Sequence, residues 1–224
     1  IIFGVIFYLN IYYDENQSKN KKIKRSSGFT PNWQQALIAL ALSTASGGFL
    51  FGAMSFLLPR YFEIHLASLS TNVAITGIFA GIVYACASFA QVAIGWLIDR
   101  ISPRLVLFWI SIGQVIFIYL ASQFENLSLF FLSIAAMSFV FGQIPITDTI
   151  LVRYVPDNWR SRVLSAKFLL NLCIGASVLP FTSYLLKIGY DLKMIFTFAS
   201  FIAIGVLVSS VILPSQVKEL NPNI

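Results

Sequence analysis

Charged residues, histidine and cysteine are scarce in this chain of 224 residues. Asp, Glu, Lys and Arg make up 11% of it, whereas soluble domains contain about 25%. A single His and two Cys are too few for a zinc site or a disulfide framework, so we expect no metal and no cofactor. We interpret Cys86 and Cys173 as small apolar residues within helices.

The sequence also lacks the short motifs that mark many hydrolases and nucleotide-driven proteins. It contains no H-E-x-x-H, no G-x-S-x-G, no Walker loop and no paired acids in the middle of an apolar run. The first three of these motifs supply zinc ligands, a nucleophile and a cradle for phosphates. We therefore predict neither an enzyme nor a transporter that is driven by ATP through this chain alone.

Apolar residues take the place of the missing charges. They make up 58% of the chain, and the mean hydropathy is +0.81. They form six runs of about 20 to 26 residues, and a helix needs roughly twenty to cross a bilayer. The predicted spans cover 36–58, 72–98, 105–124, 127–152, 163–186 and 194–213. No stretch alternates as a strand would, so the predicted fold class is all-α, a polytopic membrane protein of six transmembrane helices in a lipid bilayer.

Polar stretches divide the chain into four parts. Residues 1–13 are apolar but too short to span a bilayer, and the first residue is Ile rather than Met, so we interpret them as the end of a truncated transmembrane helix. Residues 14–32 form a basic linker, 33–214 hold the six helices, and 215–224 form a tail.

Basic residues are concentrated in alternate loops. With the linker on the cytoplasmic side, the loops after the second and fourth spans and the tail lie on that side too, together with most of the fifteen Lys and Arg. By the positive-inside rule we place the linker and the C-terminus in the cytoplasm and the spans in the plasma or inner membrane. The net charge of +6 is thus a signal of topology, and we expect no nucleic-acid partner.

The loop after the second span carries the clearest motif. It reads Gly95-x-Leu97-x-Asp99-Arg100-x-x-x-Arg104. This pattern resembles the G-x-L-x-D-R-x-G-R-R/K loop of the major facilitator superfamily, with departures at Pro103 and Leu105. The resemblance implies the C-terminal six-helix half of a secondary active transporter, which carries a small solute by alternating access. Its partner would be a missing N-terminal six-helix half of the same protein.

The loop after the fourth span, residues 153–162, is similar to a second turn of that family. Its basic residues either pair with Asp99 as an inner gate that breaks during transport or form a static network at the surface, and the sequence supports both readings equally. The residues predicted for this gate are Gly95, Asp99, Arg100, Arg104, Arg153, Arg160 and Arg162.

Polar side chains inside the spans mark the predicted solute pathway, because lipid offers them no partner. The candidates are Thr44, Ser46, Tyr84, Gln91, Gln143, Asp148 and Asn171. For Asp148 the sequence leaves three roles open: an ion pair, with Arg153 or Arg100, proton coupling, and simple solvation. Two helix faces rich in glycine, around Gly48 and Gly77, either permit close packing or contribute to the pathway.

A second class of function also fits the sequence. Six spans of this kind suit a non-transporting membrane module, such as a receptor, a channel subunit or a scaffold. A start codon near Ile1 and stable homodimers would favour that alternative.

Overall fold

In the computed structural model of this chain, residues 30–66 and 72–214 are described. The predicted truncated helix at 1–13, all but the last residues of the predicted linker and the predicted tail at 215–224 lie outside the described residues. The helices are α2 (Trp33–His65), α3 (Val73–Ile98), α4 (Pro103–Gln123), α5 (Asn126–Tyr154), α6 (Asp157–Lys187) and α7 (Leu192–Ile212). The described residues contain these six helices and no strand, which confirms the all-α fold class.

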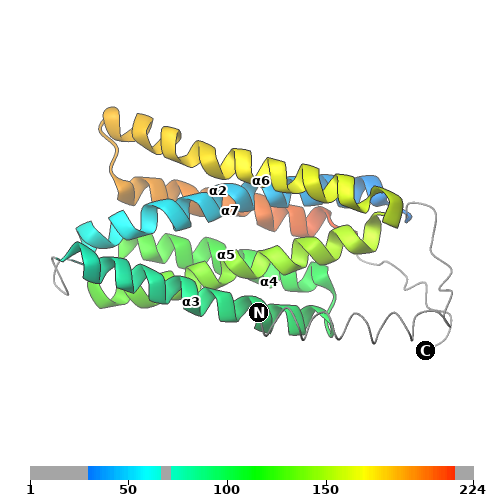
Figure 1. Cartoon of the computed structure of the whole chain (residues 1–224), viewed down its shortest axis with the longest axis horizontal. Coiled ribbons are helices and arrows are strands. Elements are labelled where there is room, and N and C mark those ends of the chain that lie inside the picture. The colour runs from blue at the N-terminus through cyan, green and yellow to red at the C-terminus, as the bar shows by residue number, and fades with distance from the viewer. Residues whose placement is uncertain (1–29, 67–71, 215–224) are drawn as a thin grey trace, which may run out of the picture.

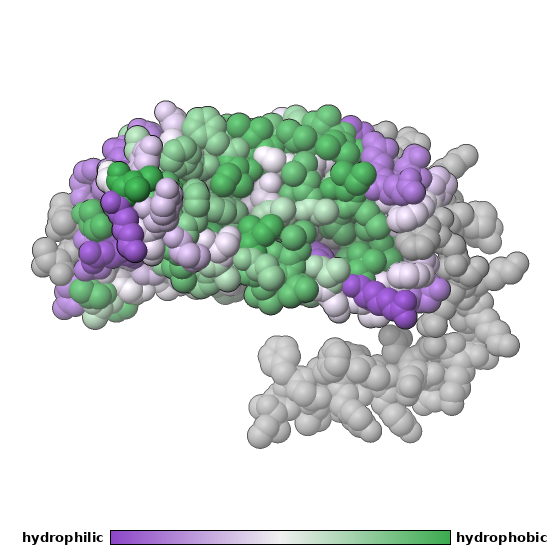
Figure 2. All heavy atoms as spheres, turned by 90° about the horizontal axis from the view of Figure 1, so that it is seen from above, coloured by the Kyte–Doolittle hydropathy of each residue, from purple (hydrophilic) through white to green (hydrophobic). Residues whose placement is uncertain are grey.

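Each of the six helices is long and apolar enough to cross a membrane. Figure 2 shows their apolar side chains as a broad belt between two hydrophilic ends. This distribution suits a protein whose middle faces hydrocarbon and whose ends face water. The chain is therefore an integral membrane protein.

The helices form two three-helix units, α2–α4 and α5–α7, that interlock. In the first unit α2 packs against α6 and α7, and in the second unit α5 packs against α3 and α4 in the corresponding way. Because each unit has three helices, the second crosses the bundle in the opposite direction to the first. This is the arrangement of an inverted repeat, and the sequence shows no matching repeat.

Two helices lie at opposite flanks of the bundle, α3 against α5 and α6 against α2 (Figure 1). In the apolar stretch of 18 residues that defines each span, 61% of the residues of α2 are buried, compared with 22% in α3 and 11% in α6. Most side chains of α3 and α6 thus point away from the other described helices.

Glycines allow α2 and α6 to approach closely. A Cβ atom at Gly52 would lie 2.5 Å from the carbonyl oxygen of Gly175, and one at Gly48 would lie 3.0 Å from that of Asn171. Close packing is thus confirmed for the glycine face of α2. On α3, by contrast, a Cβ atom at Gly77 would meet no described atom within 4 Å, so this glycine is not required by a close approach to another described helix.

The proline in α2 leaves one backbone carbonyl to be satisfied by another helix. Pro59 has no N–H, so the carbonyl of Ser55 four residues earlier loses its partner within the helix. The hydroxyl of Tyr84 on α3 donates a hydrogen bond to this carbonyl oxygen at 2.9 Å. Such a bond is needed because lipid supplies no donor.

The carbonyl freed by the proline in α5 also accepts a hydrogen bond from a side chain of α3. Pro145 frees the carbonyl of Phe141, and Nε2 of Gln91 donates to that oxygen at 3.3 Å. Tyr84 and Gln91 are seven residues apart, about two turns, and so lie on one face of α3. These two side chains therefore fix α3 to α2 and α5.

We expect Gly52→Ala to destabilise the contact between α2 and α6, because the added methyl group would lie 2.5 Å from the carbonyl oxygen of Gly175. Overpacking of this kind costs about 1–3 kcal/mol, and thermal unfolding of the purified protein in detergent would show it as a lower midpoint. The matched control is Gly77→Ala, where the methyl group meets nothing within 4 Å. A midpoint unchanged by Gly52→Ala would contradict the close approach.

A double-mutant cycle tests the link between Tyr84 and Pro59. Tyr84→Phe removes the donor to the Ser55 carbonyl and should lower stability by about 0.6–1.7 kcal/mol, the range for hydrogen bonds between membrane helices. Pro59→Ala restores an N–H that can bond this carbonyl within α2, so Tyr84→Phe should cost much less in that background. Equal losses in both backgrounds, measured by unfolding in detergent, would show that the tyrosine does not serve the freed carbonyl.

Candidate functional site

A cavity of about 250 Å³ lies between α2, α5 and α6. Its lining residues are Thr44, Gly47 and Phe51 of α2, Val140, Gln143, Ile144 and Thr147 of α5, and Lys167, Phe168, Asn171 and Leu172 of α6. Most of this lining is apolar, and Lys167 is its one charged side chain. Three predicted pathway residues, Thr44, Gln143 and Asn171, meet here.

Gln143 links the helices around this cavity by side-chain hydrogen bonds. Its Nε2 donates to the carbonyl oxygen of Ser43 at 2.8 Å and to the hydroxyl of the same residue at 2.9 Å. Its Oε1 accepts a hydrogen bond of 2.9 Å from Nε2 of Gln114. All three residues are buried, so this network ties α5 to α2 and α4 within the apolar bundle. The amide of Gln143 is thus engaged in packing the helices.

Gln114 is a member of this network that the predicted pathway set lacks. Its Nε2 also donates to the carbonyl oxygen of Phe139 at 3.1 Å. An amide side chain in the middle of the apolar run 105–124 was the signal that could have found it, because such a group needs a partner inside the membrane.

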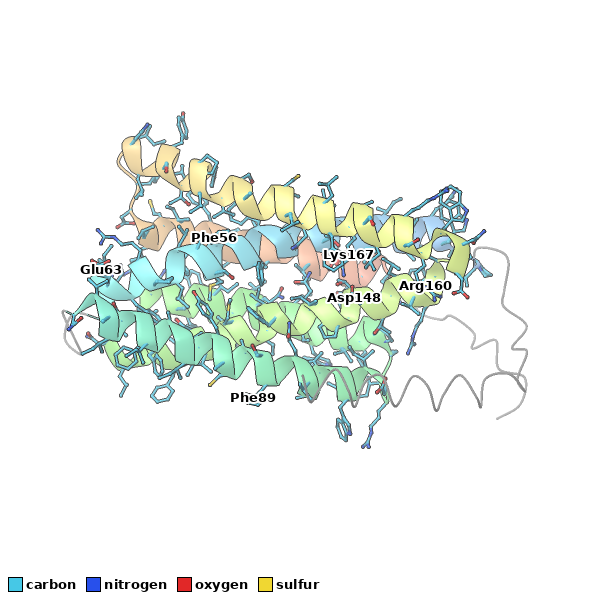
Figure 3. The ribbon with its side chains drawn as sticks, in the orientation of Figure 1. Phe56, Glu63, Phe89, Asp148, Arg160 and Lys167 are labelled. Atoms are coloured by element: carbon cyan, nitrogen blue, oxygen red, sulfur yellow. The ribbon has the colours of Figure 1, made fainter. Side chains whose placement is uncertain are left out.

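An ion pair between Asp148 and Lys167 joins α5 to α6 beside the cavity. Figure 3 shows the two side chains between these helices, nearer to the end of the bundle that carries Arg160 than to the end that carries Glu63. The Lys167 side chain is 9% exposed, and that of Asp148 is 42% exposed. The acid is therefore the partner with more access to its surroundings.

The prediction that Asp148 pairs with Arg153 or Arg100 is wrong, because its partner is Lys167. Arg153 lies five residues further along α5 and so projects from a different face, and Arg100 follows the end of α3. The helix α6 begins at Asp157, earlier than the predicted span. Lys167 consequently lies about ten residues into the helix, roughly 15 Å along its axis, where it reaches α5 rather than the end of the bundle.

Thr44 contributes a polar group without a partner to the cavity. Its side chain is buried, and Oγ1 has no hydrogen-bond partner among the described residues. The neighbouring Thr147 differs, because its hydroxyl donates to the carbonyl oxygen of Ile144 on its own helix at 2.9 Å. A buried hydroxyl without a partner is unfavourable, so Thr44 has an unmet need for a hydrogen-bond partner beside the cavity.

Three other predicted pathway residues lie outside this lining. Ser46 faces α7, where a Cβ atom at Gly205 would lie 2.3 Å from its hydroxyl oxygen. Tyr84 and Gln91 donate to the carbonyls freed by the two prolines. These side chains join helices to one another.

Two of the predicted gate residues cap helix ends. Arg104 donates from Nε to the carbonyl oxygen of Ser210 at 3.3 Å and from Nη2 to that of Val211 at 3.1 Å. Cations at a helix C-terminus bond its last carbonyls and offset the negative end of its dipole. Arg160 pairs with Asp157 at 2.6 Å and donates to a carbonyl oxygen near the end of α5.

Two further arginines stack on tryptophans at the same end of the bundle. The guanidinium carbon of Arg100 lies 3.7 Å from the ring centroid of Trp96, and that of Arg162 lies 5.0 Å from the ring centroid of Trp159. Exposed cation–π contacts of this kind contribute about 0.5–1 kcal/mol. Both arginines are therefore positioned by an aromatic residue of their own segment.

The remaining gate residues are Gly95, Asp99 and Arg153. Asp99 is the exposed C-cap residue of α3 and belongs to none of the ion pairs found within residues 30–66 and 72–214. Arg153 is exposed in the last turn of α5. A Cβ atom at Gly95 would meet no described atom within 4 Å. The pairing of Asp99 with the basic residues of the loop at 153–162 thus stays a prediction.

In the described part of the chain, no group of three or more His, Cys, Asp and Glu side chains lies close enough together to hold a metal ion. The site is built from hydroxyls, amides, aromatic rings and one ion pair.

Neither a scan against protein-family models nor a search of curated proteins finds a match to this chain. A search of solved structures finds the crystal structure of a variant of the E. coli fucose:proton symporter FucP, with a TM-score of 0.68 and 12% sequence identity. The match covers 83% of this chain and 43% of the symporter chain, so this chain spans less than half of the protein that it resembles. At 12% identity the likeness establishes the fold alone. The described helices share the fold of the matched part of that symporter.

Proposed function

We propose that this chain forms one half of a secondary active transporter, which carries a small solute across the membrane by alternating access. The observation that carries the proposal is the cavity between α2, α5 and α6, which holds a buried hydroxyl without a partner and a charged side chain. Polar and ionisable groups at membrane depth are unfavourable and generally serve a substrate or ion pathway. The symporter with the similar fold is a transporter by its name, and we carry over only that class.

A second six-helix unit would supply the other wall of the pathway. The outward faces of α3 and α6 support this part of the proposal, because they remain largely exposed in the described helices. The match to 43% of the symporter chain also fits a partner unit of similar size. We propose the N-terminal half of the same protein as that unit.

The end of the bundle that holds Arg100, Arg104 and Arg160 would face the cytoplasm. The excess of arginine there supports this orientation under the positive-inside rule. Since Arg104 and Arg160 already cap helices, Asp99 is the residue of this end best suited to pair with the second unit as part of an inner gate. The surrounding membrane would then be the plasma or inner membrane.

Cysteine accessibility in the complete protein tests alternating access. In a background with Cys86→Ser and Cys173→Ser, we expect Thr44→Cys to react with a membrane-impermeant maleimide added from either face of sealed vesicles. The control is Phe201→Cys, because Phe201 is 60% exposed on α7, whose outward face is not part of the proposed contact with the second unit. That cysteine should react from neither face, since a lipid-facing thiol is protected.

Reaction of Thr44→Cys from one face only, or from neither, would favour a receptor or scaffold over a transporter. Current recordings in a planar bilayer distinguish a channel from a transporter, because a channel passes ions through one continuous opening and a transporter does not. Single-channel currents together with reaction from both faces would overturn the transporter proposal.

A further inference from the structure

The ion pair beside the cavity is asymmetric, and this asymmetry points to the charge of the solute. Lys167 is 9% exposed and lines the cavity, whereas Asp148 is 42% exposed and is not part of the lining. The cavity therefore presents one positive charge and no negative charge to a ligand. An organic cation would have to enter against that charge.

Removing the acid from this pair without replacing it would be strongly unfavourable. A buried cation that loses its partner retains its desolvation penalty without the compensating attraction. The more exposed Asp148 is the partner that can turn away, and Lys167 then needs another anion. A carboxylate on the solute meets that need, while a neutral solute does not.

The rest of the lining fits an apolar body rather than a polyhydroxylated one. Phe51 and Phe168 contribute aromatic rings, and Nζ of Lys167 lies 5.9 Å from the ring centroid of Phe168. The unpartnered hydroxyl of Thr44 is available as a donor to one further oxygen. The cavity of about 250 Å³ is smaller than the pockets of about 300–1,000 Å³ that hold drug-sized ligands.

We infer that this cavity binds a small organic anion with an apolar body, whose carboxylate replaces that of Asp148 on the ammonium group of Lys167. The inference rests on the proposed transport function and specifies its substrate class. Exchange of the carboxylate at Lys167 also explains how binding of the solute would alter the contact between two helices. The helices α5 and α6 touch sparsely, so replacing the ion pair by the solute would loosen the contact between them beside the cavity.

The test uses the complete purified protein and three small acids, benzoate, phenylacetate and hexanoate, together with benzamide and benzylamine as neutral and cationic comparisons. We expect at least one acid to raise the midpoint of thermal unfolding in a saturable way, and benzamide and benzylamine to leave it unchanged. The inference would be overturned if benzamide stabilised the protein as much as the acids do. It would also be overturned if none of the three acids stabilised the protein.

Variants of the two charged residues locate the bound anion. Asp148→Asn removes the competing carboxylate and should tighten binding of the acid by about tenfold. Lys167→Gln should abolish binding, while Lys167→Arg should retain it. The matched control is Lys187→Gln, because Lys187 lies exposed in the last turn of the same helix. Acid binding that survives Lys167→Gln, or that is no tighter in Asp148→Asn, would contradict the exchange at Lys167.

Failure of this inference is distinguishable from failure of the transport proposal. Reaction of Thr44→Cys from both faces, without binding of any acid, would leave a transporter and exclude this substrate class. Acid binding that depends on Lys167, without access from both faces, would establish the anion site and exclude alternating access. If Lys167→Gln does not fold, the comparison of benzoate with benzamide in the unaltered protein still decides the question.

Discussion

Every backbone polar group of a membrane-spanning segment has to find its partner within the protein, because hydrocarbon offers none. Most groups do so inside their own helix, and the exceptions shape the contacts between helices. Tyr84 satisfies a carbonyl freed by Pro59, and Gln91 satisfies one freed by Pro145. Arg104 meets the same need at the end of α7. Three polar side chains that look functional in the sequence thus complete the hydrogen bonding of neighbouring helices.

The same constraint separates the polar groups that hold the bundle together from those that remain available. Gln143 is committed to Ser43 and Gln114, whereas the hydroxyl of Thr44 has no partner among the described residues. Lys167 is paired, but with a more exposed acid. In the proposed transporter, such a cavity would keep a rigid wall while a solute binds beside Thr44 and Lys167.

The interlocked arrangement of the two three-helix units explains why these groups converge. The first helices of the units, α2 and α5, lie inside the bundle, and each is covered by the second helix of the other unit. Each of these two inner helices contains a proline, and α3 supplies the donor to the carbonyl that each proline frees. The cavity lies where α2, α5 and α6 meet.

The sequence by itself determined the six spans, because an apolar run of about twenty residues has only the helix available to it in lipid. It also identified Thr44, Gln143 and Asn171 as inward-facing, since a polar group within a span requires a partner or a cavity. It could not assign the partner of Asp148. That choice depended on the start of α6 and on which turn of α6 lies beside α5, and the hydropathy of either helix alone contains no information on their relative position. Only the tertiary structure placed Lys167 there.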